Sequence, residues 1–175
     1  MSAVSDCQLT MKDCVVLEVI LDRSRDRHDP TIPIIRQKLA GAKVFFRDEI
    51  DARVVTLNSR VVFRVNDGPP KTRVIVQRDE GLFPGAILPI TALRGIALLG
   101  MREGQSVTVR QLCGSVETIR VDRVEYQPEA AMRLARRSAA RADENRRIVR
   151  LPEHRRMRSS AVPLADGDDP GPTAA

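Results

Sequence analysis

Residues 60–78 read RVVFRVNDGPPKTRVIVQR, and this stretch decides the fold class. Two runs rich in β-branched residues, 60–65 and 71–78, have the composition of strands. Between them lies NDGPP at 66–70, whose residue types favour turns, and Asp-Gly is a favoured hairpin dipeptide. The stretch therefore predicts an antiparallel hairpin.

The alternation of the second run predicts which side chains share a face of the strand. We expect one face to carry Val74 and Val76, and the other to carry Arg73, Ile75 and Gln77.

Further strands are expected on both sides of the hairpin. VVTL at 54–57 precedes it, and 106–112 and 115–126 follow it, joined by a tight turn at Cys113-Gly114. Within 87–105 we expect a short helix at 92–99, closed by Gly100. The order of three strands, a short helix and two strands over 53–126 indicates an α+β domain.

Two helices are expected before this domain. Residues 10–26 show helical apolar spacing, and Thr10 with Asp13 suits a capping arrangement, although VVLEVIL at 15–21 also has strand composition. Thr31 suits the N-cap of a second helix over 32–46. The two helices predict an antiparallel hairpin over 10–48, after a flexible leader at 1–9.

The basic charge is concentrated near the carboxyl end of the sequence. Residues 127–160 contain ten arginines and four acidic residues, whereas 161–175 contain three aspartates and no basic residue. The Ala- and Arg-rich segment 127–150 predicts a basic helix. The segment 151–175 is rich in Pro, Gly, Asp, Ser and Ala, so we expect a disordered tail.

Composition limits the function classes. The three cysteines include no C-x-x-C pair and their number is odd, which favours a reducing compartment. No signal peptide is apparent at the start, and the apolar runs are far shorter than the ~20 residues that cross a bilayer. We expect a cytoplasmic monomer with no membrane partner.

The sequence offers no catalytic pattern. Neither His28 nor His154 has a nucleophile signature beside it, and no zinc, P-loop or dinucleotide motif occurs. We therefore expect a binding protein that is not an enzyme and needs no cofactor. The expected tip of the helical hairpin carries three acids, which could hold a divalent cation or form an ordinary polar turn: Asp22, Asp26 and Asp29.

Three segments resemble a known family. VVTLNSRVVFR (54–64), ITALRGIALLGMREGQSV (90–107) and VDRVEYQPEAA (121–131) resemble the Rnk family, the regulators of nucleoside diphosphate kinase, which is related to the GreA/GreB transcript-cleavage and elongation factors. The resemblance covers roughly 10–133. It is specific from 54 onward, rests on layout over the helices, and leaves 134–175 unmatched.

The resemblance implies an FKBP-like antiparallel β domain without prolyl isomerase activity. In Gre factors this domain docks at the rim of the secondary channel of RNA polymerase, and a long coiled coil carries acids to the catalytic metal. Here the two expected helices of about 13–17 residues reach only ~20–25 Å. Docking without cleavage is therefore the implied function, because carboxylates that stop short of a metal cannot coordinate it.

We expect the polymerase-docking surface in the loop and short helix at 88–94, where apolar residues stand among polar ones: Pro89, Ile90, Thr91, Leu93 and Arg94. In the alternative, Ile90 and Leu93 only cover the core. Ala97, Leu98 and Leu99 are expected in the core.

A second hypothesis is a non-specific nucleic-acid-binding module. It uses the arginines of the basic helix to neutralise phosphates: Arg133, Arg136, Arg137, Arg141, Arg146 and Arg147. The same arginines could contact an acidic protein or form a solvated helix face. Salt-dependent binding that disappears on deleting the segment separates this hypothesis from polymerase docking.

Overall fold

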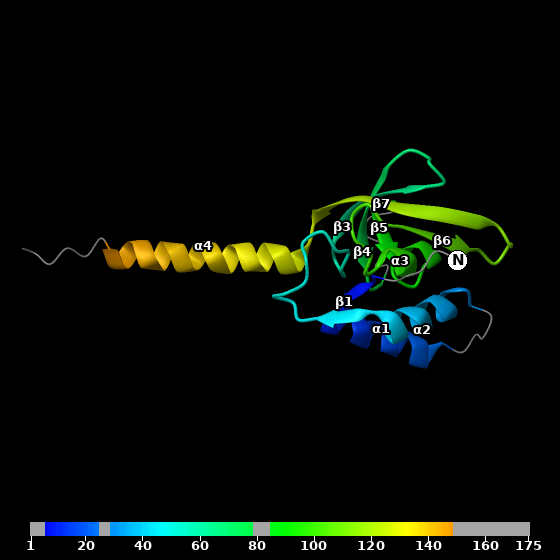
Figure 1. The fold of residues 1–175 in the computed structure, drawn as a ribbon, viewed down its shortest axis with the longest axis horizontal. Helices are drawn as coiled ribbons and strands as arrows, with labels where there is room; N and C mark the ends of the chain where they lie inside the picture. The colour runs from blue at the N-terminus through cyan, green and yellow to red at the C-terminus, as the bar shows by residue number, and fades with distance from the viewer. Residues whose placement is uncertain (1–5, 25–28, 79–84, 149–175) are drawn as a thin grey trace, which may run out of the picture.

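The computed structural model describes residues 6–24, 29–78 and 85–148, with side chains described up to residue 144. This part of the chain forms a mixed α+β fold (Figure 1). Its elements are β1 (Gln8–Thr10), α1 (Met11–Arg23), α2 (Thr31–Gly41), β2 (Lys43–Phe45), β3 (Arg60–Val65), β4 (Lys71–Val76), β5 (Ile87–Pro89), α3 (Leu93–Leu98), β6 (Ser106–Arg110), β7 (Val116–Tyr126) and α4 (Pro128–Ile148).

The central sheet is five-stranded, with the order β5-β4-β3-β7-β6. The hairpin of β3 and β4 is confirmed as antiparallel, and Asn66 and Asp67 both have positive φ in its turn. Asn and Asp tolerate that conformation better than other non-glycine residues. The sheet is not wholly antiparallel as expected, because β5 pairs with β4 in parallel. β5 was not predicted, since its three residues are too few to show a period.

The strand expected at 54–57 does not form. Val54 makes only an isolated bridge to Arg102, and residues 55–57 form a buried loop. The backbone N–H of Thr56 is satisfied locally, because it donates to Ser59 Oγ at 3.1 Å. Such a side-chain bond replaces the ladder that a strand would need.

The core covers the face of β4 that carries Ile75. Ile75 is fully buried, whereas Val74 and Val76 are half-buried. Apolar residues occupy both faces of this strand, so alternation alone could not tell which face the core would cover.

The N-terminal helices begin through local polar contacts. The expected capping box is present: Asp13 N–H donates to Thr10 Oγ1, and Thr10 N–H donates to the Asp13 carboxylate, both at 3.1 Å. At the start of α2, Thr31 is already helical instead of serving as the N-cap. Its N–H and hydroxyl donate to Asp29 Oδ1 at 2.8 and 2.7 Å.

The expected leader at 1–9 and the expected helix end at 46 both need correction. α2 ends at Gly41, and β2 then pairs in parallel with β1. Within the expected leader, Cys7 and Leu9 are buried in the core. The β-branched and aromatic residues after Gly41 favour a strand, but its partner lies about 35 residues earlier, beyond the reach of local patterns.

The helices and the sheet share one hydrophobic core. Val16, Leu17, Ile32 and Ile35 pack in the same cluster as Val61, Phe63, Ile75 and the expected core residues Ala97, Leu98 and Leu99. Figure 1 shows α1 and α2 side by side against the sheet. The helical hairpin therefore lies on the body of the protein instead of projecting from it.

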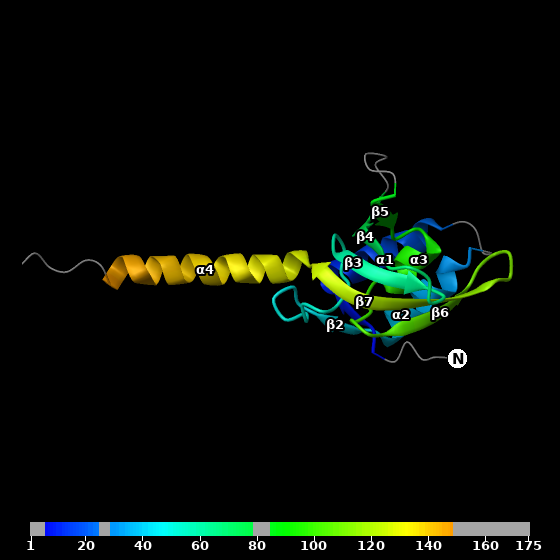
Figure 2. The same ribbon diagram turned by 90° about the horizontal axis from the view of Figure 1, so that it is seen from above.

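α4 is the element that projects. Its 21 residues extend away from the body in both views, for a length of about 30 Å (Figures 1 and 2). Among the described helices none is long and apolar enough to cross a bilayer.

Candidate docking surface

The five residues expected at the docking surface differ in their exposure to solvent. Ile90 is fully buried, which corrects the expectation that it is exposed and agrees with the alternative that it covers the core. Thr91 is exposed, and Pro89, Leu93 and Arg94 are half-buried. Ile90 N–H donates to Val76 O at 2.8 Å, which holds its backbone on β4.

Leu93 and Arg94 line a hollow of about 460 Å³. Its walls come from the start of α2, from β5 and α3, and from the turn between β6 and β7: Pro30, Leu88, Ala92, Leu93, Arg94, Gln111, Leu112 and Cys113. Most of this lining is apolar. The hollow therefore joins part of the predicted surface to a turn that the sequence analysis did not include.

Leu112 is the main residue that sequence reasoning missed. It lies in the β6–β7 turn with 78% of its surface exposed. Gln111 N–H donates to Ser115 O at 2.8 Å, and Gly114 has a positive φ of 82°, so the turn is tight. A large apolar residue at a hairpin turn, where polar residues are usual, was the available signal.

A polar clamp orients Arg94 at the edge of the hollow. Its guanidinium donates to both carboxylate oxygens of Glu117, at 2.8 and 2.7 Å. These hydrogen bonds raise the pKa of Arg94 and hold the pKa of Glu117 below its usual value. Gln111 also donates to Glu117, so α3, β7 and the turn are tied together beside the apolar lining.

The acids expected at the hairpin tip do not form a cation site in the described structure. Asp22 is exposed at the end of α1, Asp29 is engaged with Thr31, and Asp26 lies outside the described residues. No group of three or more His, Cys, Asp or Glu side chains suited to a metal occurs among the described residues. The tip instead borders a second hollow of about 270 Å³, which Asp29 lines together with Arg78 and Thr91.

The arginines expected to bind nucleic acid are not all free to do so. Arg133 donates to Arg47 O at 2.8 Å, and Arg136 pairs with Asp48 at 3.0 Å. Arg137 and Arg141 are exposed. The side chains of Arg146 and Arg147 lie outside the described ones.

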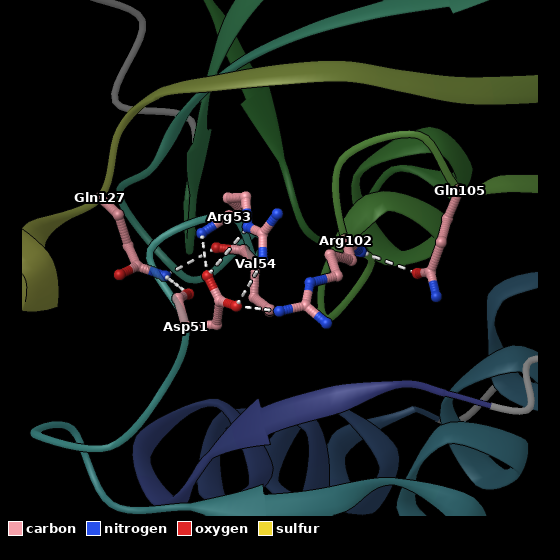
Figure 3. A network of polar contacts seen from close by, with 6 residues as sticks. All are labelled: Asp51, Arg53, Val54, Arg102, Gln105 and Gln127. Carbon is pink, nitrogen blue, oxygen red and sulfur yellow. Dashed lines mark hydrogen bonds and ion pairs between the residues drawn. The ribbon is translucent and has the colours of Figure 1, made fainter.

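The root of α4 is held by buried polar contacts (Figure 3). Gln127 Nε2 donates to Asp51 O and to Val54 O, both at 2.8 Å. The Asp51 carboxylate in turn pairs with Arg53 and Arg102. These contacts join the end of β7 to the loop before β3 and so set the direction in which α4 leaves the body.

The sequence of the chain is similar to that of named bacterial regulators. It is 34% identical over 121 residues to the regulator of nucleoside diphosphate kinase of Escherichia coli strain K12, covering 68% of this chain and 88% of that protein. The Shigella flexneri protein of the same name matches with the same identity and coverage. No protein-family model matches.

A solved structure shares the fold. The prokaryotic transcription elongation factor GreA/GreB from Nitrosomonas europaea superposes with a TM-score of 0.55 and 29% identity, over 69% of this chain and 98% of that one.

Proposed function

Because the chain belongs to the family of the regulators of nucleoside diphosphate kinase, and its fold is that of a GreA/GreB factor, we propose that it binds RNA polymerase. In this proposal it docks at the secondary channel, without catalysis, and modulates elongation by competing with Gre-type factors. The β region 53–126 acts as the FKBP-like docking unit.

The observation that carries this proposal is the exposed Leu112 beside the hollow. Leu112 and the half-buried Leu88 and Leu93 offer an apolar contact, and Arg94 stands at its edge in an orientation held by Glu117. A central apolar contact with a fixed arginine beside it is a common form of protein-binding surface. Of the residues first expected at this surface, we retain the four that are exposed or half-buried: Pro89, Thr91, Leu93 and Arg94. Ile90 is buried in the core and does not contact the partner in this proposal.

The dimensions of the helical hairpin support a function without cleavage. α1 has 13 residues and α2 has 11, so neither exceeds about 20 Å in length. Both helices also bury their apolar faces in the common core, which keeps the end of α1 and the start of α2 on the body. A protein docked by its β region would therefore hold Asp22 and Asp29 outside the enzyme's catalytic centre.

Leu112→Asp and Leu134→Asp form a matched pair for testing the docking surface. Both leucines are exposed, at 78% and 64%, but Leu134 lies on α4. We expect Leu112→Asp to weaken binding to core RNA polymerase at least tenfold, a loss of about 1.4 kcal/mol or more. Leu134→Asp should bind like the native chain in a fluorescence titration with core enzyme.

Two results would contradict the proposal. One is a native chain that does not bind core polymerase at micromolar concentration. The other is equal binding of the native chain and Leu112→Asp, which would place the contact elsewhere on the molecule.

A further inference from the structure

A third hollow lies at the root of α4. Figure 1 shows that α4 leaves the body at the end opposite to the turn between β6 and β7. Its volume is about 330 Å³, and its lining comes from the start of α1, the loop after β2 and the first turn of α4: Thr10, Met11, Lys12, Phe46, Arg47 and Glu129. None of these residues takes part in the proposed docking on polymerase.

The mouth of this hollow exposes two large apolar side chains. Met11 is 54% exposed and Phe46 is 67% exposed. Phe46 is one of only four phenylalanines in a chain that has no tryptophan. Covering a side chain of this size releases about 1.5–3 kcal/mol, so the hollow is suited to an apolar residue of another segment.

Two cations lie in the lining of the hollow, beside one carboxyl group, Glu129, which accepts a hydrogen bond from Thr56. The two cations are Lys12 and Arg47, and the bond from Arg133 to Arg47 O at 2.8 Å keeps a third cation beside the hollow. In the described part of the chain, no ion pair joins Lys12, Arg47 or Arg133 to a carboxylate. An occupant should therefore combine apolar side chains with acidic ones.

The chain itself contains such a segment. Residues 161–175 carry Asp166, Asp168 and Asp169 without any basic residue, and Val162 and Leu164 come just before these acids. From residue 148 to residue 164 an extended chain spans up to about 55 Å. The helix from Glu129 to Ile148 is about 30 Å long, so the segment can return to the root of α4.

We propose that residues 162–169 of this chain turn back along α4 and occupy the hollow. Val162 and Leu164 then contact Met11 and Phe46, and the three aspartates face Lys12, Arg47 and Arg133. Because the segment is tethered, its effective concentration is in the millimolar range, and even a weak contact is populated. The bound segment places acids beside the arginines of α4 and reduces their attraction for other anions.

The test observes the methionine methyl groups of the full chain by NMR. The methyl of Met11 reports on the hollow, and the methyl of Met101, which is buried in the core, is the internal control. The variant V162A/L164A should shift the Met11 resonance and leave Met101 unchanged. Phe46→Ala should remove most of the effect that V162A/L164A has on Met11.

A charge variant and a matched control test the acidic half of the contact. D166N/D168N/D169N should shift Met11 in the same direction as V162A/L164A. D143N/E144Q, which removes two acids from α4, should not. A synthetic peptide of residues 161–175 should bind V162A/L164A at least tenfold more tightly than the native chain, because the native tail competes for the hollow.

Three results would overturn the proposal. The first is a Met11 resonance that is the same in the native chain and both tail variants. The second is a shift that depends on protein concentration, which would identify the tail of a second copy as the occupant. The third is a DNA oligonucleotide that shifts the Met11 resonance by the same amount in the native protein and in the tail variants, because a bound tail should reduce the binding of DNA to the native protein.

Discussion

Asp13 is a buried carboxyl group that connects α1 to the loop before β3. It accepts hydrogen bonds from Thr10 and, at 3.2 Å, from the N–H of Leu57, and it is 1% exposed. Burial raises the pKa of Asp13 above its usual value, against the opposing effect of these hydrogen bonds. The native state therefore binds a proton at Asp13 at pH values where the unfolded chain has already lost it.

This difference predicts how stability depends on pH. A carboxyl with a raised pKa in the native state contributes stability that is full below its unfolded pKa of about 3.9 and is lost as pH rises through the native pKa. The advantage of the native chain over Asp13→Asn should therefore shrink as pH rises above about 4, by up to about 1.4 kcal/mol per pH unit, until Asp13 ionises in the native state. Urea unfolding across this range measures it.

A buried substitution in the same helix provides the control. Leu17→Val changes no titratable group, so its cost should not vary with pH. If the advantage over Asp13→Asn instead grew with pH, the hydrogen bonds would outweigh burial and the carboxylate would be the favoured form.

Lys38 is a second buried polar group, and it connects α2 to α3. It is 1% exposed and donates to Ala97 O at 3.0 Å and to Leu99 O. Burial lowers the pKa of this lysine. Because the two carbonyls belong to the end of α3 and the residue after it, the side chain of α2 substitutes for a helix cap and ties α2 to α3.

At the scale of elements, the contact of α3 with β5 leaves no room for a side chain at Gly95. A Cβ there would lie 2.1 Å from Pro89 O and 3.1 Å from Ile90 Cα, both backbone atoms. The helix thus packs directly on the strand that ends at Pro89. This contact also sets the position of Leu93 and Arg94 in the candidate docking surface.

Gly95→Ala and Gly41→Ala should have opposite effects. Gly95→Ala should destabilise the protein by about 2–3 kcal/mol, because backbone must move to admit the methyl group. Gly41, at the end of α2, has nothing within 4 Å of its Cβ position, so Gly41→Ala should be neutral or stabilise by up to about 1 kcal/mol. Urea unfolding compares the two variants.

The Gly95 variant also tests the link to function. It should weaken polymerase binding more than its loss of stability explains, because α3 carries part of the proposed contact. A Gly95→Ala protein as stable as the native chain would show that α3 does not pack on β5 as described.

At the scale of the whole molecule, the body and α4 are joined through a small number of buried bonds. Gln127 is 3% exposed and its amide bridges two backbone carbonyls. Two residues further on, Glu129 accepts a hydrogen bond from Thr56 Oγ1 at 2.7 Å. These contacts fix the basic helix α4 to the end of the body opposite to the candidate docking surface (Figure 1).

Gln127→Ala should loosen α4 without unfolding the body. The variant removes both hydrogen bonds of the Gln127 amide and leaves Val54 O without a partner, at a cost of about 2 kcal/mol, whereas Asp51 O still accepts from Val54 N–H at 3.1 Å. We expect the residual dipolar couplings of α4 amides to decrease relative to those of β7. Gln37→Ala, an exposed change on α2, should leave both sets unchanged. Couplings of α4 that stay equal to the native ones would show that Gln127 does not set its direction.

The sequence by itself determined the elements that depend on residues close together in the chain. The structure confirms the hairpin at 60–78, the short helix before Gly100 and the capping box at Thr10 and Asp13. The strands predicted at 106–112 and 115–126 also form, as Ser106–Arg110 and Val116–Tyr126. Each depends on residues a few positions apart, through turn chemistry, alternation or a side-chain bond to nearby backbone. The family resemblance, which depends on the same segments, was also available from the sequence and is confirmed.

Only the tertiary structure decided which apolar residues are covered. Ile90 and Leu112 both stand beside polar residues in the sequence, but α3 and β4 bury the first and the hairpin turn exposes the second. The pairing of β1 with β2, the burial of Lys38 and the face of β4 in the core likewise depend on segments far apart in the chain. Burial is a property of the whole packed core, so no local pattern contains it.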